Sequence, residues 1–444
     1  MNEAPREQWG SRFGFVLAAV GSAVGLGNMW RFPYFAAENG GAAFVFLYII
    51  MVALIGLPIM LAEFAIGRGS KKSPILALAH FGGNAWKPLG VLFVLGGFLI
   101  LSYYAVIAGW TLRYAWNALF AGFGSDPAGF FGEVSTGWDA ACWHLLFMAV
   151  TVLIVAGGIR RGIERSAIIL MPLLALIVVG LAIFASTLPG AGAGYAFYLK
   201  ADFREILSLS VLTEATSQAF FSLSLGMGAM LTYSSYLSRD DNMPRESVII
   251  AGSDFMIAFL AGLMVFPLIF ALGLSDDLSA STIGALFISL PNAFAEMGAV
   301  GRPVGILFFL ALLVGALTSA ISLLEVVVSA IIDTWKWPRR KAALIMGLLI
   351  TIVGIPSALS IDFLGLVDQL AANLFLVVGA FSLSIFVGWV MPDPIGEVRK
   401  GAENIRWLPL WYAFIRFVVP PLLLFVLYFT VLNTWNTVAD LIAG

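Results

Sequence analysis

The sequence predicts an all-helical integral membrane protein. Of its 444 residues, 61% are hydrophobic and only 11% are charged. Soluble domains carry about a quarter charged residues, and so few polar residues could not cover a water-soluble core of this size. The mean hydropathy of +0.97 agrees with this interpretation. The apolar residues are also grouped into long stretches, and a helix needs about 20 such residues to cross a bilayer.

Eleven apolar stretches follow one another along the chain, and each is expected to form one membrane-spanning helix. They lie at residues 13–36, 42–67, 88–120, 143–159, 166–187, 211–237, 247–274, 303–332, 342–360, 363–391 and 407–433. Two connections, 188–210 and 275–302, are too polar or broken to span and are expected outside. The second contains IGALFISLP, which could fold back over an external vestibule or lie at the interface as an ordinary helix.

The positive charges predict the orientation of these helices. Eighteen of the 24 Lys and Arg residues lie before the first stretch or in the connections after the even-numbered ones. Because cytoplasmic loops carry the excess of Lys and Arg, we expect a multi-pass protein of the cell membrane with its N-terminus inside and its C-terminus outside. The other six are Arg31, Arg113, Lys200, Arg204, Arg302 and Arg416.

Composition also excludes several kinds of site. The single cysteine, Cys142, excludes an internal disulfide framework. The chain has only two histidines, His80 and His144, which are 64 residues apart, so no clustered zinc or haem site can be recognised. The net charge of −2 gives no electrostatic basis for binding nucleic acid.

Glycines interrupt the first and sixth stretches near their middles. The first reads VGSAVGLGNMWRFP and the sixth FFSLSLGMGAMLTYSSY. Glycine permits unwinding, and unwound backbone inside a membrane is tolerated only where it lines a cavity or site. Paired interruptions of this kind point to a binding site between two broken helices. Small-residue helix packing is the alternative, but it accounts poorly for Asn28 and Arg31 in the same segment.

Other polar side chains lie within the apolar stretches and supply mainly oxygen donors. They are Glu63, Asp254, Thr318, Ser319 and, at the outer end of the tenth stretch, Asp368. Hard oxygen ligands without Cys or His suit an alkali cation better than a transition metal. For the two hydroxyl residues, hydrogen bonds to their own helix carbonyls are the common alternative.

Several motifs resemble signatures of the neurotransmitter:sodium symporter family. They are VGLGNMWRFPY, ENGGAAF, GLPIMLAEFAIGR, SYYAVIAGWTL, IERSAIILMP, FFSLSLGMGAMLTYSSY and GALTSA. The resemblance implies a LeuT-type fold with discontinuous helices 1 and 6. It implies two inverted five-helix repeats, at 1–187 and 211–391, separated by the external loop 188–210. The second repeat would contain the external loop 275–302. Residues 392–444 would then hold helix 11 and a short external C-terminus, as in bacterial members with eleven helices.

The resemblance further implies two sodium sites and no chloride. One site would use the Ala23 carbonyl, Asn28, Ser222 and Asp254, together with the substrate carboxylate. The other would use the carbonyls of Gly21, Val24 and Gly315 with the hydroxyls of Thr318 and Ser319. Animal members have asparagine at Asp254 and a serine at Ala258. The fixed carboxylate would supply the charge that chloride otherwise brings.

The same resemblance implies a neutral, hydrophobic or aromatic L-amino acid as substrate. Its carboxylate would face the helix break at Gly25 and Gly27, where free amides and the helix dipole favour an anion. Monoamine members have an aspartate at Gly25, and its absence argues for an amino acid. The remaining pocket residues would be Ala23, Ile100, Tyr104, Phe221, Ser222, Ser224, Met227, Ser319 and Leu323.

Gates are implied at both ends of this pocket. Arg31 and Asp368 match the family's external gate, and Arg6 and Asp333 match the internal gate, with Trp9 and Tyr236 nearby. Without the resemblance, Arg6 could be a simple cytoplasmic positive charge. In helix 5, Gly162 and Pro172 would let the cytoplasmic end unwind, and a static proline kink is the alternative.

Other functions remain open from the sequence. A related transporter could carry a different small zwitterion, such as a small neutral amino acid or a taurine-like osmolyte. A channel would need a continuous polar lining, whereas the polar residues cluster near mid-span and at two ends. An intramembrane enzyme would need a nucleophile with its base, and neither histidine lies among the buried polar residues.

Overall fold

The computed structural model describes residues 6–124, 126–204, 208–273, 285–402 and 405–443. In chain order, its first α-helices are α1 Arg12–Ala23, α2 Phe32–Glu38, α3 Ala42–Met51, α4 Leu57–Ser70, α5 Pro74–Gly82, α6 Lys87–Phe120, α7 Pro127–Ser135, α8 Gly137–Ala156, α9 Arg165–Ser186, α10 Ala191–Leu199 and α11 Leu209–Ser222. The later ones are α12 Ala229–Ser234, α13 Met243–Ala271, α15 Leu290–Glu296, α16 Gly301–Trp335, α17 Arg339–Leu359, α18 Ile361–Asp368, α19 Leu376–Ile385, α20 Pro394–Arg399, α21 Leu408–Phe417 and α22 Val419–Ala443.

Short segments of wider or tighter helix join several of these elements. The π-helical ones are η1 Gly27–Arg31, η2 Val52–Gly56, η4 Ile159–Glu164, η6 Ala285–Ser289, η8 Gln369–Phe375 and η9 Phe386–Val390. The 3₁₀ turns are η3 Asn84–Trp86 and η7 Gly298–Val300. An isolated β-bridge joins Gly41 to Ala201.

The membrane-spanning pattern agrees with the sequence in ten of the eleven stretches. Within the described residues, nine helices are long and apolar enough to cross a membrane, and α1 with the η1–α2 helix forms a further pair bent by 51°. The stretch predicted at 211–237 is instead divided into α11 and α12 by residues 223–228. The eleventh span therefore remains a prediction that depends on joining these two helices.

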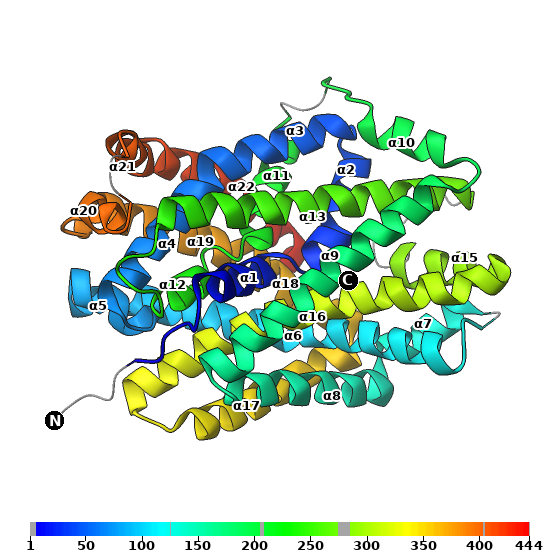
Figure 1. The fold of residues 1–444 in the computed structure, drawn as a ribbon, viewed down its shortest axis with the longest axis horizontal. Helices are drawn as coiled ribbons and strands as arrows, with labels where there is room; N and C mark the ends of the chain where they lie inside the picture. The colour runs from blue at the N-terminus through cyan, green and yellow to red at the C-terminus, as the bar shows by residue number, and fades with distance from the viewer. Residues whose placement is uncertain (1–5, 125, 205–207, 274–284, 403–404, 444) are drawn as a thin grey trace.

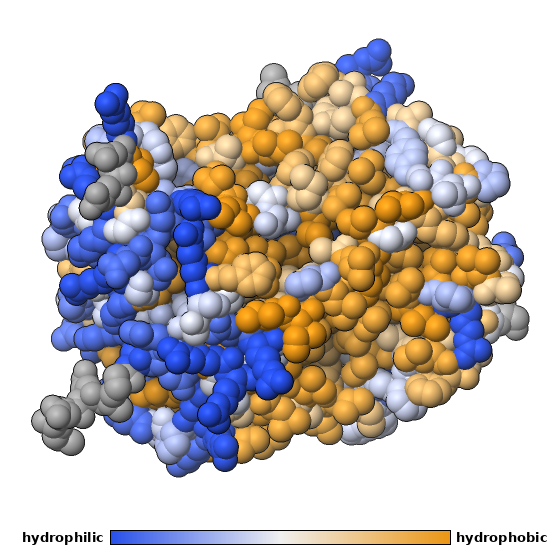
Figure 2. Space-filling model, in the orientation of Figure 1, coloured by the Kyte–Doolittle hydropathy of each residue, from blue (hydrophilic) through white to orange (hydrophobic). Residues whose placement is uncertain are grey.

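The long helices surround the broken ones (Figure 1). Helices α6, α8, α16 and α17 pack against one another, and α1 packs against α9, α13 and α16. Hydrophilic residues gather at the end of the molecule that carries the N-terminus, α5 and α20, and broad hydrophobic surface covers much of the rest (Figure 2). The broken helix α1 thus lies within a bundle whose exterior suits lipid.

Local sequence signals explain where many helices begin. The Ser11 hydroxyl accepts a hydrogen bond from Gly14 N at the start of α1, and Asn242 caps α13 through Arg245 N. Proline occupies the first turn of α4, α5, α6 and α21, where its missing N–H costs no helical hydrogen bond.

The two connections expected outside the membrane contain helices of their own. Helix α10 lies within 188–210, and η6 and α15 lie within 275–302. In the second connection, Phe287 is buried against Trp110 and Phe131, and its carbonyl accepts a hydrogen bond of 2.6 Å from the Tyr114 hydroxyl. The described part of this piece thus packs back onto the bundle, and its place over an external vestibule stays a prediction. Residues 275–284 of this connection lie outside the described residues.

Candidate functional site

The first helix break lies between α1 and η1, at residues 24–26. The side-chain oxygen of Asn28 accepts a hydrogen bond of 2.9 Å from Gly25 N, so this asparagine holds the unwound backbone. Across the break, Gln218 of α11 donates to the Gly27 carbonyl at 3.2 Å. A Cβ at Gly25 would lie 2.5 Å from the Ser319 hydroxyl oxygen, so a larger residue would require its neighbours to shift.

The second break lies between α11 and α12, at residues 223–228. Ser224, Gly226 and Gly228 have φ angles of 53°, 77° and 74°, in the left-handed region that favours glycine. The fully buried carboxylate of Glu63, from α4, accepts hydrogen bonds from Gly226 N at 2.8 Å and Leu231 N at 3.0 Å. These bonds satisfy amides that a continuous helix would have satisfied internally.

Between the two breaks lies a small cavity. Its lining comprises Ser22, Ala23, Gly25, Leu26, Gly27, Ile100, Tyr104, Phe221, Ser222, Ser224, Met227, Ser319 and Leu323. All eleven residues that the sequence predicts for the substrate pocket are among them, and the sequence analysis missed Ser22 and Leu26. The cavity volume of about 20 Å³ is enough for roughly one water molecule. The side chains would have to move apart to admit a larger guest.

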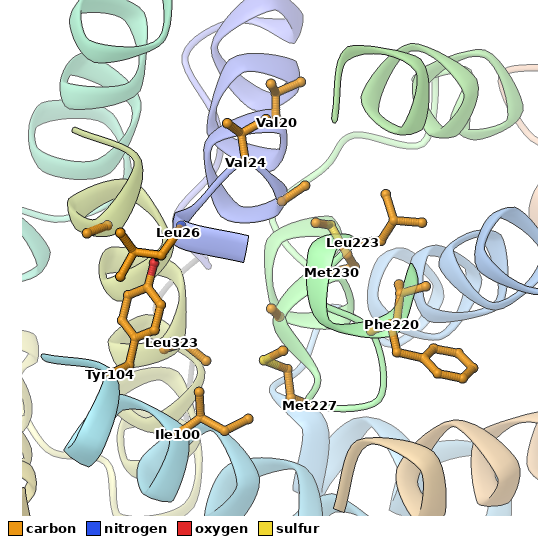
Figure 3. Close-up of a cluster of buried hydrophobic side chains, with 14 of the residues drawn as sticks. Val20, Val24, Leu26, Ile100, Tyr104, Phe220, Leu223, Met227, Met230 and Leu323 are labelled. Carbon is orange, nitrogen blue, oxygen red and sulfur yellow. The ribbon is translucent and has the colours of Figure 1, made fainter. Parts of the chain in front are cut away.

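The cavity wall is apolar on the side of α6 and α16. In Figure 3, Tyr104 extends from α6 to the break at Leu26, and Ile100, Met227 and Leu323 lie around the same space. The Tyr104 hydroxyl accepts a long hydrogen bond of 3.4 Å from Leu26 N. On the other wall, the Ser224 hydroxyl donates to the Ser22 carbonyl at 2.7 Å. Polar backbone and apolar side chains therefore face the same cavity.

Three of the four residues predicted for the first sodium site, Asn28, Ser222 and Asp254, meet around the Asp254 carboxylate, which is fully buried in α13. The Ser222 hydroxyl lies 2.8 and 2.9 Å from the two oxygens of its carboxylate, and Asn28 donates to it at 2.7 Å. The Tyr48 hydroxyl donates to the same carboxylate at 3.1 Å, a partner that the sequence analysis missed. The Asp254 carboxylate and the hydroxyls of Ser222 and Tyr48 supply oxygens of the kind that a hard cation prefers. Asn28 presents its NH2 group to this cluster, while its oxygen accepts from Gly25 N.

The second set of predicted sodium ligands meets where α16 passes the break in α1. The Ser319 hydroxyl lies 3.5 Å from the Gly21 carbonyl and 3.4 Å from the Val24 carbonyl. The Thr318 hydroxyl donates to the carbonyls of Val314 and Gly315, both at 3.1 Å. Thr318 thus makes the hydrogen bonds to its own helix carbonyls that were the alternative to sodium binding. One of these carbonyls, that of Gly315, is itself a predicted sodium ligand. The predicted donors are thus in contact in two groups, Ser319 with the carbonyls of Gly21 and Val24, and Thr318 with that of Gly315. Hydroxyl and carbonyl oxygens suit an alkali cation.

The two residues of the predicted external gate line a second, larger cavity next to the central one. This outer cavity has a volume of about 260 Å³, and Arg31 and Asp368 both line it. Arg31 does not pair with Asp368 in this structure. It donates instead to the side-chain oxygen of Asn373 at 3.0 Å, with its guanidinium 5.1 Å from the Phe221 ring centre. The predicted gate pair is therefore open, and Asn373 is a partner that the sequence analysis missed.

The internal gate residues are in contact. Arg6 Nη1 lies 2.7 Å from an Asp333 carboxylate oxygen, and its guanidinium lies 4.7 Å from the Tyr236 ring centre. The Trp9 indole donates to the Tyr233 carbonyl at 3.0 Å and packs edge-on against Tyr236. The N-terminal segment is thus packed against Asp333, Tyr233 and Tyr236, as the predicted internal gate requires.

The predicted unwinding segment of helix 5 is wound in this structure. Gly162 lies in the π-helical segment η4, and a Cβ there would lie 1.9 Å from the Ile154 carbonyl. Pro172 lies inside the continuous helix α9. The Glu164 carboxylate accepts hydrogen bonds from Gly10 N and the Ser11 hydroxyl, so this segment also holds the N-terminal chain.

Known proteins resemble this chain in sequence and in fold over nearly its whole length. A family model described as the sodium:neurotransmitter symporter family covers residues 6–123 and 135–440. An uncharacterised sodium-dependent transporter of Methanocaldococcus jannaschii is 36% identical over 96% of this chain and 90% of its own length. Another, YhdH of Bacillus subtilis, is 35% identical over 95% of this chain and 96% of its own. The crystal structure of MhsT in complex with L-phenylalanine aligns with a TM-score of 0.87 at 43% identity, over 96% of this chain and 100% of that chain.

Proposed function

Because the chain belongs to the sodium:neurotransmitter symporter family, a family of transporters rather than enzymes, we propose that it couples sodium entry to the uptake of a neutral, hydrophobic or aromatic L-amino acid. The observation that carries this proposal is the cavity between the two helix breaks. All eleven residues expected to contact substrate line it, and the two oxygen-rich clusters adjoin it.

The choice of an amino acid rests on the chemistry of the two cavity walls. The amides at the break in α1 would bind the substrate carboxylate, and the carbonyls of Ala23, Phe221 and Ser222 would accept from its ammonium. Gly25 has no side-chain carboxylate that could pair with an amine lacking a carboxyl group. Because Gly25 lies close to Ser319, an aspartate at this position would not fit unless its neighbours shifted. The apolar wall at Ile100, Met227 and Leu323 suits a hydrophobic side chain. The complex of MhsT with L-phenylalanine supports an aromatic guest.

We propose two sodium sites and no requirement for chloride. Asp254, Asn28, Ser222 and the Ala23 carbonyl would hold the first ion, and the Asp254 carboxylate would balance its charge. Thr318 and Ser319, with the carbonyls of Gly21, Val24 and Gly315, would hold the second. Ala258, one turn from Asp254, offers no hydroxyl to an anion. When bound, the first ion would balance the charge of the buried Asp254 carboxylate, and the hydroxyl and carbonyl oxygens at the breaks would coordinate both ions.

Transport would proceed by alternating access between two inverted repeats, 1–187 and 211–391, with eleven spanning helices, the N-terminus inside and the C-terminus outside. The closed contact of Arg6 with Asp333 and the open pair of Arg31 with Asp368 fit a state accessible from outside. Release to the inside would require the Arg6 contact to break and the segment between Gly162 and Pro172 to unwind.

Uptake into proteoliposomes tests this function. Labelled alanine, leucine, phenylalanine, tryptophan and taurine would be offered with an inward sodium gradient, with potassium in its place, and with gluconate replacing chloride. We expect saturable, sodium-dependent uptake of the large apolar amino acids, unchanged by gluconate. Uptake of taurine alone, non-saturating flux or a chloride requirement would each contradict the proposal.

A further inference from the structure

Arg416 is a positive charge inside a membrane-spanning segment. It lies near the end of α21, within the apolar helix Leu408–Leu432. None of the ion pairs among the described residues involves it. A charge at this depth is costly unless it is paired or reaches the interface, so its surroundings should contain the reason for its presence.

Aromatic rings, rather than carboxylates, surround the guanidinium. Its carbon lies 5.5 Å from the Trp389 ring centre, 5.9 Å from that of Tyr412 and 5.3 Å from that of Phe417. Within the described part of the chain, its one hydrogen bond is a long one of 3.4 Å to the Tyr412 hydroxyl, and its buried Nε has no partner there. A guanidinium has five N–H donors, and those of its two terminal nitrogens that Tyr412 does not accept remain for a further acceptor.

Backbone packing holds this group in place. Gly388, at the end of the tenth predicted stretch, lies so close to α21 that a Cβ there would be 3.1 Å from the Arg416 Cα. The Tyr412 hydroxyl donates to the Gly388 carbonyl at 3.0 Å, which orients the ring beside the guanidinium. The Arg416 cluster, defined as Arg416, Tyr412, Trp389 and Phe417, is therefore formed by the fold and not by a freely moving side chain.

Trp389 indicates that the Arg416 cluster lies toward the hydrophilic end of the molecule, because it stands one residue before the end of the span Ile361–Val390, whose chain continues into α20. Helix α21 begins at that end, beside α20 (Figures 1 and 2). Trp389 is 46% exposed, Phe417 64% and Leu410 69%, although all three lie on apolar spanning segments. Partly exposed Trp and Tyr at the end of a span are typical of the depth of lipid headgroups, and the neighbouring apolar surface suits acyl chains.

We propose that the Arg416 cluster binds the phosphate of an anionic phospholipid, in the leaflet on the N-terminal side. The guanidinium would donate charge-assisted hydrogen bonds to two phosphate oxygens, and Phe417 and Leu410 would contact the acyl chains. A lipid fits better than free phosphate because exposed apolar residues flank the charge. An anionic lipid fits better than a zwitterionic one because no carboxylate of the described residues is paired with Arg416 to receive a headgroup ammonium.

Native mass spectrometry of the delipidated full-length protein tests the site. Wild type, Arg416→Gln and Arg406→Gln would be titrated with phosphatidylglycerol, phosphatidylcholine and inorganic phosphate. Arg406 is the matched control, because it is exposed just before α21 and has no aromatic cage. We expect Arg416→Gln to weaken phosphatidylglycerol binding roughly tenfold, because charged hydrogen bonds to the phosphate are lost. Arg406→Gln should change this binding less than about twofold.

Three results would overturn the proposal. They are equal phosphatidylglycerol affinity in wild type and Arg416→Gln, an equal loss in Arg406→Gln, and displacement of the bound lipid by millimolar inorganic phosphate. Should Arg416→Gln fail to fold, the double variant Trp389→Leu with Tyr412→Phe decides. It keeps the charge and removes the cage, and it should lose part of the preference for phosphatidylglycerol over phosphatidylcholine. An unchanged preference would refute the site.

Discussion

Glu63 and Gly226 are 163 residues apart, yet a carboxylate oxygen of Glu63 accepts a 2.8 Å hydrogen bond from the Gly226 amide. The second oxygen accepts from Leu231 N at 3.0 Å, on the far side of the same break. One side chain from α4 therefore supports the unwound backbone that forms a wall of the central cavity. The integrity of the cavity should depend on this carboxylate even though Glu63 does not line it.

Glu63→Ala should lower the stability of the protein more than Glu63→Gln. The alanine leaves two buried amides without an acceptor, at about 1–3 kcal/mol each, whereas glutamine keeps one acceptor oxygen. Thermal unfolding in detergent measures the difference, with the exposed Glu38→Ala as the control. Identical midpoints for Glu63→Ala and Glu38→Ala would mean that the break does not need the carboxylate.

Asp254→Asn should weaken sodium-dependent substrate binding and create a response to chloride. The substitution removes the negative charge and turns one acceptor of the Ser222 hydroxyl into a donor. Binding would be titrated with sodium in chloride and in gluconate, and Asp362→Asn, on an exposed helix start, serves as the control. If the wild type already requires chloride, the role assigned to Asp254 is wrong.

The double substitution Thr318→Val with Ser319→Ala should reduce sodium affinity far more than thermal stability. It removes two of the five proposed ligand oxygens. The lost hydrogen bonds to helix carbonyls are each worth only about 1 kcal/mol. A sodium titration of substrate binding, beside a melting curve of the same sample, separates these effects. An unaltered titration in the folded variant would leave only the back-bonding role that Thr318 shows here.

Arg6→Ala should open the route on the N-terminal side. It removes the 2.7 Å contact with Asp333, the 2.7 Å hydrogen bond to Ser235 and the stacking on Tyr236. Hydrogen exchange of residues 9–23 should become faster, while Arg399→Ala, which removes an exposed arginine of α20 at the same end, should not change it. Equal exchange in both variants would assign Arg6 to the general excess of positive charge instead.

Sequence reasoning located the central cavity because its signals are local. Glycines at 226 and 228 have the left-handed backbone that their residue type permits, and Asn28 beside Gly25 could be recognised as out of place in an apolar helix. The wall residues Ile100 and Met227 came from the family resemblance, and the fold brings them to one cavity.

The partners that sequence reasoning missed depend on tertiary packing. Tyr48 lies in an apolar stretch where a tyrosine is unremarkable, and its bond to Asp254 exists only because α3 passes α13. Arg31 has Asn373 as its partner because the fold brings η8 beside it, and nothing in the local sequence distinguishes Asn373 from Asp368 as the acceptor. The short helices α5 and α10 were missed because spanning length was the criterion for a helix.

Met227→Phe should shift the substrate preference from aromatic toward smaller aliphatic amino acids. Met227 is 2% exposed, lines the central cavity and lies between Gly226 and Gly228, whose backbone conformations fix its direction. A methionine can move aside for an aromatic guest, whereas a phenylalanine would be a rigid wall in a cavity that must already expand to admit one. One or two misplaced methylene volumes are worth about 1–3 kcal/mol, which is roughly a tenfold to hundredfold change in relative affinity. Recognition of the carboxylate and ammonium uses backbone groups and should survive, so alanine should bind nearly as before. Competition binding of alanine, leucine, phenylalanine and tryptophan checks this, with Met256→Phe on an exposed face of α13 as the control. If all four affinities move together, Met227 packs the break and does not select the substrate.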